Sequence, residues 1–211
     1  MALSGLSFAV SGILGTLEYY LLKIMPEALL EPFLRWLRLR KVISQIPPDA
    51  EILDVGCGTK AAFLKTIAPR IKQGVGIDFK VPTTQSGNLK TTQMMLGGVL
   101  PFEDDSFDVV TMLAVLEHIE QEKPILQEIH RVLRDNGKLV VTVPSVWSQP
   151  VLEFLSYKLK IISEAEIRDH KRYYDRQKLR KVLVNESNFK EFKHQYFQCW
   201  MNNFCTVIKR S

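Results

Sequence analysis

The feature that most constrains the fold of this chain is a regular alternation of short apolar runs with helical segments. Residues 51–55, 74–78, 107–113 and 138–143 are Val/Ile-rich runs, and residues 60–69 and 124–134 between them have helical character. Uninterrupted apolar strands are typical of a parallel sheet that is buried on both faces. The alternation therefore predicts an α/β fold, a doubly wound and mostly parallel sheet with helices on both faces.

The pattern is less regular between the second and third of these runs and again after residue 144. Residues 81–93 are polar and are expected to form a loop, and a weak strand is expected over residues 94–96. After residue 144 we expect an insertion, then a helix over residues 176–185. Two further strands are expected over residues 189–197 and 201–208.

The first 46 residues are expected to form a helical extension that ends at Pro47 and Pro48. Apolar residues recur there at steps of three and four, which makes one apolar stripe: Leu3, Leu6, Val10, Ile13, Leu17, Tyr20 and Ile24. Serines and glycines dilute the stretch too much for a spanning helix, and it lacks the early positive charge of a signal peptide. Three interpretations stay open: a helix packed on the domain, which we favour, a homodimer contact, or a peripheral membrane contact.

Composition limits the partners and the compartment. The 211 residues are 46% hydrophobic and 24% charged, as in a globular domain with its own core. Three cysteines without a CxxC pair make neither a disulfide framework nor a zinc site, so we expect no metal and a cytoplasmic location. The net charge is only +5, and the sequence lacks the dense basic stripe of nucleic-acid-binding proteins. We therefore expect no nucleic-acid partner.

A glycine-rich turn follows the first apolar run. Gly56-Cys57-Gly58 stands where a strand turns into a helix, so backbone N–H groups there can approach an anionic ligand. Asp54 argues against a dinucleotide, because a carboxylate beside a pyrophosphate is repulsive. It suits a ligand with a positive group, such as an ammonium or a sulfonium.

A second carboxylate ends the next apolar run. Asp78 follows Gly58 by twenty residues, at a place where a carboxylate can accept both hydroxyls of a ribose. The alternative is a structural role as a helix cap or a loop tie. With Asp54 and the glycines upstream, we favour the ribose.

Several segments taken together resemble the class I S-adenosylmethionine-dependent methyltransferases, in particular the small-molecule enzymes typified by ubiquinone-biosynthesis methyltransferases. The resemblance covers residues 45–145 and rests on segments 52–59, 76–78, 100–110, 116–119 and 131–144. It implies a Rossmann-like, seven-stranded sheet with an antiparallel C-terminal hairpin. The two strands expected after residue 188 fit that hairpin.

The resemblance also implies a cofactor, S-adenosyl-L-methionine, whose product is S-adenosyl-L-homocysteine. It places the methionine end at Asp54, Gly56, Cys57 and Gly58, the ribose at Asp78, the adenine beside Phe79, and the sulfonium near Leu113 and Ala114. Two departures from the family pattern stand out. Lys60 replaces a common third glycine, and residues 94–98 offer no acid for the adenine amine.

Candidate catalytic residues are few, because the chain has only four histidines. His118 follows the fourth strand, where it either reaches the site or packs the next helix. His170 and Tyr173 belong to a segment that resembles one covering the acceptor side in related methyltransferases, and the alternative is a polar loop. His130 and His194 are expected to be structural. Residues 145–175 would form an acceptor cap within a methyltransferase domain spanning residues 47–211.

The function expected from the sequence is transfer of a methyl group to a small-molecule acceptor, with a hydrophobic or lipid-linked compound as one candidate. Two alternatives stay open: a non-catalytic module that binds S-adenosylmethionine, and an NAD-binding oxidoreductase. A nucleic-acid methyltransferase would usually carry an Asn-Pro-Pro-Tyr or Pro-Cys motif, and Pro144 is followed by Ser145 instead.

Overall fold

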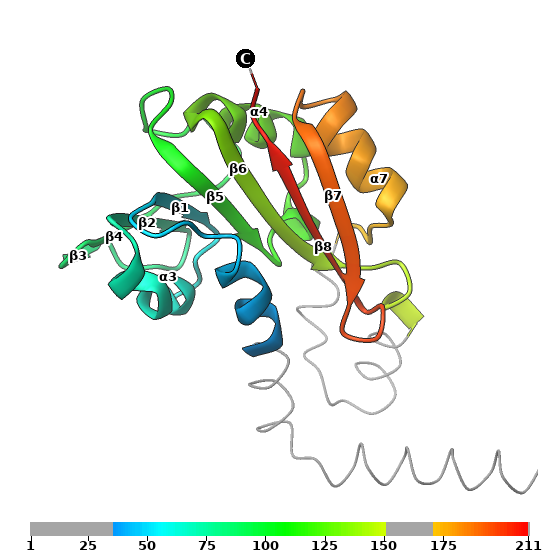
Figure 1. Cartoon of the computed structure of the whole chain (residues 1–211), viewed down its shortest axis with the longest axis horizontal. Helices are drawn as coiled ribbons and strands as arrows, with labels where there is room; N and C mark the ends of the chain where they lie inside the picture. Colours follow the sequence, from blue (N-terminus) through cyan, green and yellow to red (C-terminus); the bar gives the residue numbers. More distant parts are fainter. Residues whose placement is uncertain (1–35, 151–170, 211) are drawn as a thin grey trace, which may run out of the picture. The chain divides into compact units, whose positions relative to one another are not determined.

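The computed structural model describes residues 36–150 and 171–210, and the chain divides into two compact units, residues 1–38 and 39–211. The larger unit, which is described here, is built on one mixed sheet (Figure 1). The apolar stripe of residues 3–24 and most of the expected acceptor cap lie outside the described residues.

The sheet has eight strands in the order β3-β4-β2-β1-β5-β6-β8-β7. Strands β4, β2, β1, β5 and β6 run parallel to one another. Strand β3 pairs antiparallel with β4, and β8 pairs antiparallel with both β6 and β7. The strands are β1 (Glu51–Val55), β2 (Gln73–Asp78), β3 (Thr84–Ser86), β4 (Leu89–Gln93), β5 (Phe107–Leu113), β6 (Leu133–Pro144), β7 (Lys190–Phe197) and β8 (Asn202–Ile208). The expected doubly wound sheet with an antiparallel C-terminal hairpin is confirmed, with β3 as an additional edge strand.

Helices cover both faces of this sheet. One face packs against α4 (Glu122–Val132), α7 (Arg176–Arg180) and η4 (Lys181–Asn185). The other face packs against α3 (Ala62–Ile67) and the chain around Val42 and Ile46. The short helices η1 (Ala68–Arg70) and η2 (Leu116–His118) lie in the connections. No helix among the described residues is long and apolar enough to span a membrane.

Strand β1 shows how the sequence builds two cores. Successive side chains of a strand point to opposite faces. Leu53 and Val55 accordingly join the core under α4, whereas Ile52 joins the core under α3. Asp54 shares the face of Ile52, so its carboxylate is carried into the interior between the sheet and α3.

Two expectations about boundaries were wrong. Strand β4 covers Leu89–Gln93, within the expected loop, and it pairs with β2, while residues 94–96 lie outside any strand. Helix α4 ends at Val132 instead of Arg134, and β6 begins at once with an irregular register. Asn136 and Gly137 are therefore part of β6, where they exchange backbone hydrogen bonds with Lys209.

The parallel strands all end at the same edge of the sheet. Val55, Asp78, Gln93, Leu113 and Pro144 are the last residues of β1, β2, β4, β5 and β6. The turn between β7 and β8 joins this edge, because β7 runs parallel to β6. We call it the carboxyl edge, the place where ligands bind in open α/β sheets.

Candidate functional site

The turn after β1 is held in a sharply bent shape by backbone hydrogen bonds. Gly56 N and Cys57 N both donate to the carbonyl of Ile77 on β2, at 2.8 and 3.2 Å. Gly56 and Gly58 have φ values of +77° and +68°, in the left-handed region that favours glycine. The turn thus depends on glycine at both positions, as the sequence predicted.

The two glycines differ in what surrounds them. A Cβ atom on Gly56 would lie 2.2 Å from Val115 Cγ2, so the loop after β5 packs directly against this turn. A Cβ atom on Gly58 would meet no atom of the protein within 4 Å. The backbone at Gly58 therefore faces open space at the carboxyl edge, where a ligand can approach it. The neighbouring Lys60 is exposed.

Asp78 connects the ends of β1 and β2. Its Oδ2 accepts a hydrogen bond from Gly58 N at 3.0 Å, and its Oδ1 accepts one from Lys80 N at 2.8 Å. The carboxylate thus ties the glycine turn, the structural role considered from the sequence. Each carboxylate oxygen has more than one lone pair, so these bonds leave acceptor capacity for ligand hydroxyls.

Asp54 lies deeper, with only 2% of its surface exposed. Its neighbours in register are Gly76 on β2 and Thr111 on β5, and Thr111 Oγ1 donates a hydrogen bond to Asp54 Oδ1 at 2.6 Å. Burial raises the pKa of Asp54 from 3.8 to about 7, the Thr111 bond opposes this shift, and the charge of Asp78 adds to it. A buried carboxylate that also interacts with the charge of a second carboxylate favours a nearby cation.

Cys57 is packed into the turn. A Cβ atom on Gly76 would lie 2.8 Å from Cys57 Sγ, so the thiol takes the room that this glycine leaves on β2. Burial, with the charges of Asp54 and Asp78, raises the pKa of Cys57 to about 12. The thiol is therefore protonated at neutral pH, and its contribution to the turn is packing.

The loop after β5 forms the other wall of the carboxyl edge. Leu113 and Ala114 are partly buried, and Ala114, with φ at 59°, donates from its N–H to the carbonyl of Thr142 on β6 at 2.8 Å. His118 ends η2, half-buried, and its backbone N–H donates to Val115 O. His118 therefore lies three residues after Val115, the residue of this loop that contacts the glycine turn.

The segment of residues 171–174 is fastened to this loop by contacts that the sequence did not reveal. Arg172 donates to the carbonyls of Ile119 and Glu120, both at 2.8 Å, and lies 3.5 Å from the Glu122 carboxylate. The buried Tyr174 hydroxyl donates to the Leu116 carbonyl and to the carboxylate of Glu122.

Of the two catalytic candidates in this region, Tyr173 is described and half-buried, and His170 lies outside the described residues. Because Tyr173 stands between Arg172 and Tyr174, its backbone is fixed beside the loop after β5. Arg172 and Tyr174 hold the segment in place through their hydrogen bonds to that loop. Burial and the Glu122 carboxylate raise the pKa of Tyr174.

Phe79 follows Asp78 directly and is half exposed at the carboxyl edge. Lys80 Nζ lies 4.6 Å from the centre of the Phe79 ring, and Gln93 Nε2 donates to the Phe79 carbonyl at 2.9 Å. The ring is therefore held by its neighbours and offers a flat surface to solvent.

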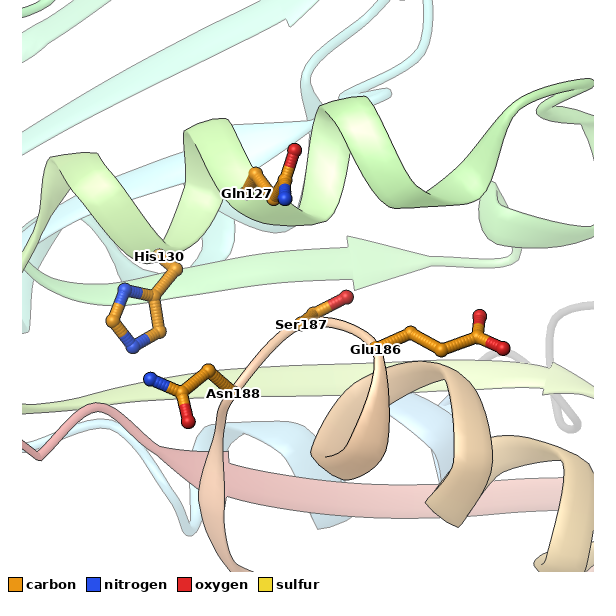
Figure 2. A pocket seen from close by; sticks show the side chains of 5 residues that line it. All are labelled: Gln127, His130, Glu186, Ser187 and Asn188. Carbon is orange, nitrogen blue, oxygen red and sulfur yellow. The ribbon is translucent and has the colours of Figure 1, made fainter.

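The remaining two histidines lie elsewhere. His130 of α4 lines a cavity of about 300 Å³ together with Gln127, Glu186, Ser187 and Asn188, toward the amino end of β6 (Figure 2). Its ring meets Phe189 edge-on, and burial lowers its pKa. His194 on β7 is hydrogen-bonded to Asn203 at 2.8 Å.

Comparison with known proteins identifies the central segment. Residues 53–141 match the family described as methyltransferase domain. The chain is 26% identical over 156 residues to a demethylmenaquinone methyltransferase of Listeria monocytogenes, covering 66% of this chain and 65% of that protein. It is 30% identical over 142 residues to a ubiquinone/menaquinone biosynthesis C-methyltransferase of Citrifermentans bemidjiense, covering 61% and 60%. The matches thus span less than two thirds of either relative.

Solved structures support the fold. Phosphoethanolamine N-methyltransferase 2 of Haemonchus contortus, solved with phosphomonomethylethanolamine and S-adenosylhomocysteine, superposes with a TM-score of 0.61 over 83% of this chain and 52% of that one, at 13% identity. The resemblance to class I methyltransferases seen in the sequence is confirmed.

Proposed function

Because residues 53–141 form a methyltransferase domain of the class I family, we propose that this chain transfers a methyl group from S-adenosyl-L-methionine to a small hydrophobic acceptor. The observation that carries the proposal is the carboxyl edge itself. A glycine turn opens to space there beside two buried carboxylates, Asp54 and Asp78.

The residues at this edge fit the parts of the cofactor. The buried carboxylate of Asp54 suits the positively charged methionine end, because a nearby cation offsets the cost of a charge away from water. Asp78 has acceptor capacity for the two ribose hydroxyls. The exposed Phe79 ring offers a surface for the adenine, and Leu113 with Ala114 would lie near the sulfonium. Gly58 permits the close approach.

The chemistry that the cofactor supplies is a methyl group already activated by a positive sulfur, open to in-line displacement. The protein's task is to align an acceptor with that methyl group and to exclude water. Val115, packed against Gly56, keeps the loop after β5 fixed relative to the glycine turn. Arg172 and Tyr174 fasten the acceptor-side segment to the same loop.

A general base is needed where the acceptor must lose a proton. His118 is our first candidate, because it lies in the loop that contacts the glycine turn. Tyr173 and His170 are proposed as acceptor-side residues, with residues 145–175 as the cap. Relatives named for menaquinone and ubiquinone biosynthesis point to a quinone-type aromatic acceptor.

Calorimetric titration of the full chain tests the proposal first. We expect micromolar binding of S-adenosylmethionine and S-adenosylhomocysteine, and no heat with NADH. Transfer of labelled methyl from S-adenosylmethionine to a demethylated quinone analogue in detergent then tests turnover. Binding of NADH alone would refute the cofactor, and binding without transfer to any quinone analogue would refute the acceptor class.

A further inference from the structure

Large apolar side chains are exposed at the carboxyl edge on both sides of the proposed cofactor site. Met95 follows β4 and is 75% exposed, Trp147 follows β6 and is 59% exposed, and Trp200, in the turn between β7 and β8, is 60% exposed. Side chains of this size are costly to leave in water when they gather at one place. Their common location calls for a partner at this end of the sheet.

The turn that carries Trp200 is fixed in an unusual conformation. Gln198, Cys199 and Trp200 have φ values of 52°, 52° and 69°, three successive non-glycine residues in the left-handed region. Such residues normally occur singly. Unfavourable backbone conformations persist mainly where function requires them.

Contacts on both sides hold Trp200 outward. Its ring stacks on Tyr196 with centres 4.9 Å apart and planes 7° from parallel. Ser145 Oγ donates to the Trp200 carbonyl, and Ser145 N donates to Met201 O at 2.9 Å. Because Ser145 and Trp147 belong to one short segment, both tryptophans lie where these hydrogen bonds join the end of β6 to the β7–β8 turn.

Exposed cations accompany these side chains. Lys60 follows the glycine turn and Lys80 follows β2, and both side chains are exposed. We call Met95, Trp147, Trp200, Lys60 and Lys80 the carboxyl-edge surface.

The amino ends of the strands have a different charge pattern. There Arg134 pairs with Glu51 and Asp108, and Lys209 pairs with Asp105 at 2.7 Å. The carboxyl edge instead combines the exposed Lys60 and Lys80 with large exposed apolar side chains.

We propose that the carboxyl-edge surface docks on an anionic lipid bilayer. Tryptophan favours the membrane–water boundary, where its ring is half buried and its N–H stays hydrated. Lysines near an anionic leaflet add electrostatic attraction. Members of the surface lie on both sides of the proposed site, with Lys80 after β2 and Trp200 before β8. These two strands are four strand spacings apart in the sheet, roughly 19 Å. Docking there would face the site toward the bilayer, and this consequence rests on the proposed function.

Vesicle co-sedimentation of the purified full chain tests the docking without any assay of methyl transfer. Vesicles of phosphatidylcholine are compared with vesicles containing a third phosphatidylserine. We expect the chain to sediment with the anionic vesicles and to be released by high salt. Replacing Trp147 and Trp200 together by alanine is expected to weaken partitioning about tenfold or more. Replacing Lys60 and Lys80 by glutamine is expected to weaken it about thirtyfold.

Matched controls separate this surface from general charge and from the rest of the chain. Lys90 and Lys190 lie near the amino ends of β4 and β7, so replacing both by glutamine removes the same charge and is expected to change partitioning less than threefold. Circular dichroism and S-adenosylmethionine titration check that the tryptophan variant is folded.

Three outcomes would overturn the proposal: no sedimentation of the wild-type chain, unchanged partitioning of the tryptophan variant, or equal losses in the two lysine pairs. Unchanged partitioning of the tryptophan variant would assign membrane binding to another part of the chain. Docking without methyl transfer would leave the surface standing and refute the proposed function alone.

Discussion

Replacing Asp54 by asparagine is expected to favour the folded protein more at pH 8 than at pH 5. The pKa of Asp54 is about 7 in the folded protein against 3.8 ordinarily. Between these values the folded state binds more protons at this site than the unfolded state, so stability falls as the pH rises. The side chain is buried, and the cost of its charge is not screened by solvent.

The size of the effect follows from the shift. Linkage gives a destabilisation of roughly 4 kcal/mol at pH 8 and roughly 2 kcal/mol at pH 5. Asparagine carries no charge at either pH and keeps an oxygen that can accept the Thr111 hydroxyl at the position of Oδ1. Its buried amide N–H groups cost about 1–3 kcal/mol if they lack acceptors, and this cost is the same at both pH values.

We therefore expect the asparagine variant to be more stable than wild type at pH 8 and to lose roughly 2 to 3 kcal/mol of that advantage by pH 5. Urea unfolding at intervals between pH 5 and 8 measures the difference between the two proteins. Titrating groups that do not interact with Asp54 cancel in that difference. Glu120, an exposed carboxylate, gives the matched control when replaced by glutamine. Parallel stability profiles for wild type and the asparagine variant would refute the reasoning.

Further predictions concern the same edge. Asp78→Ala is expected to abolish measurable S-adenosylmethionine binding by calorimetry and to destabilise the fold by about 1–3 kcal/mol, because Gly58 N loses its acceptor; unchanged affinity would remove Asp78 from the ribose site. Gly56→Val should prevent ligand binding and lower the melting temperature more than Gly58→Ala, since only Gly56 abuts another side chain, Val115; equal melting temperatures would contradict this. Tyr174→Phe should lower the free energy of unfolding by about 1–2 kcal/mol while cofactor affinity stays within twofold; loss of affinity would show a direct role in binding.

The sequence by itself determined the outline of the fold and the glycine turn. Mostly apolar runs such as residues 107–113 are typical of strands in a sheet that is buried on both faces. The parallel arrangement of these strands could therefore be predicted. Gly56 and Gly58 were identifiable because few other residues fit a turn where backbone meets a ligand. Strand β4 was not predicted from the sequence, because Leu89-Lys-Thr-Thr-Gln93 is polar. The strand lies near an edge of the sheet that is covered only by β3.

Only the tertiary structure decided which side chains meet. Asp54 and Thr111 stand 57 residues apart, and their hydrogen bond exists because β1 and β5 are neighbours in this register. The bonds of Arg172 and Tyr174 to the loop after β5 likewise join segments that are distant in the chain. Periodicity reports which face a residue occupies, whereas the pKa of Asp54 depends on its partners and on how much water they exclude. Those are properties of the packed sheet.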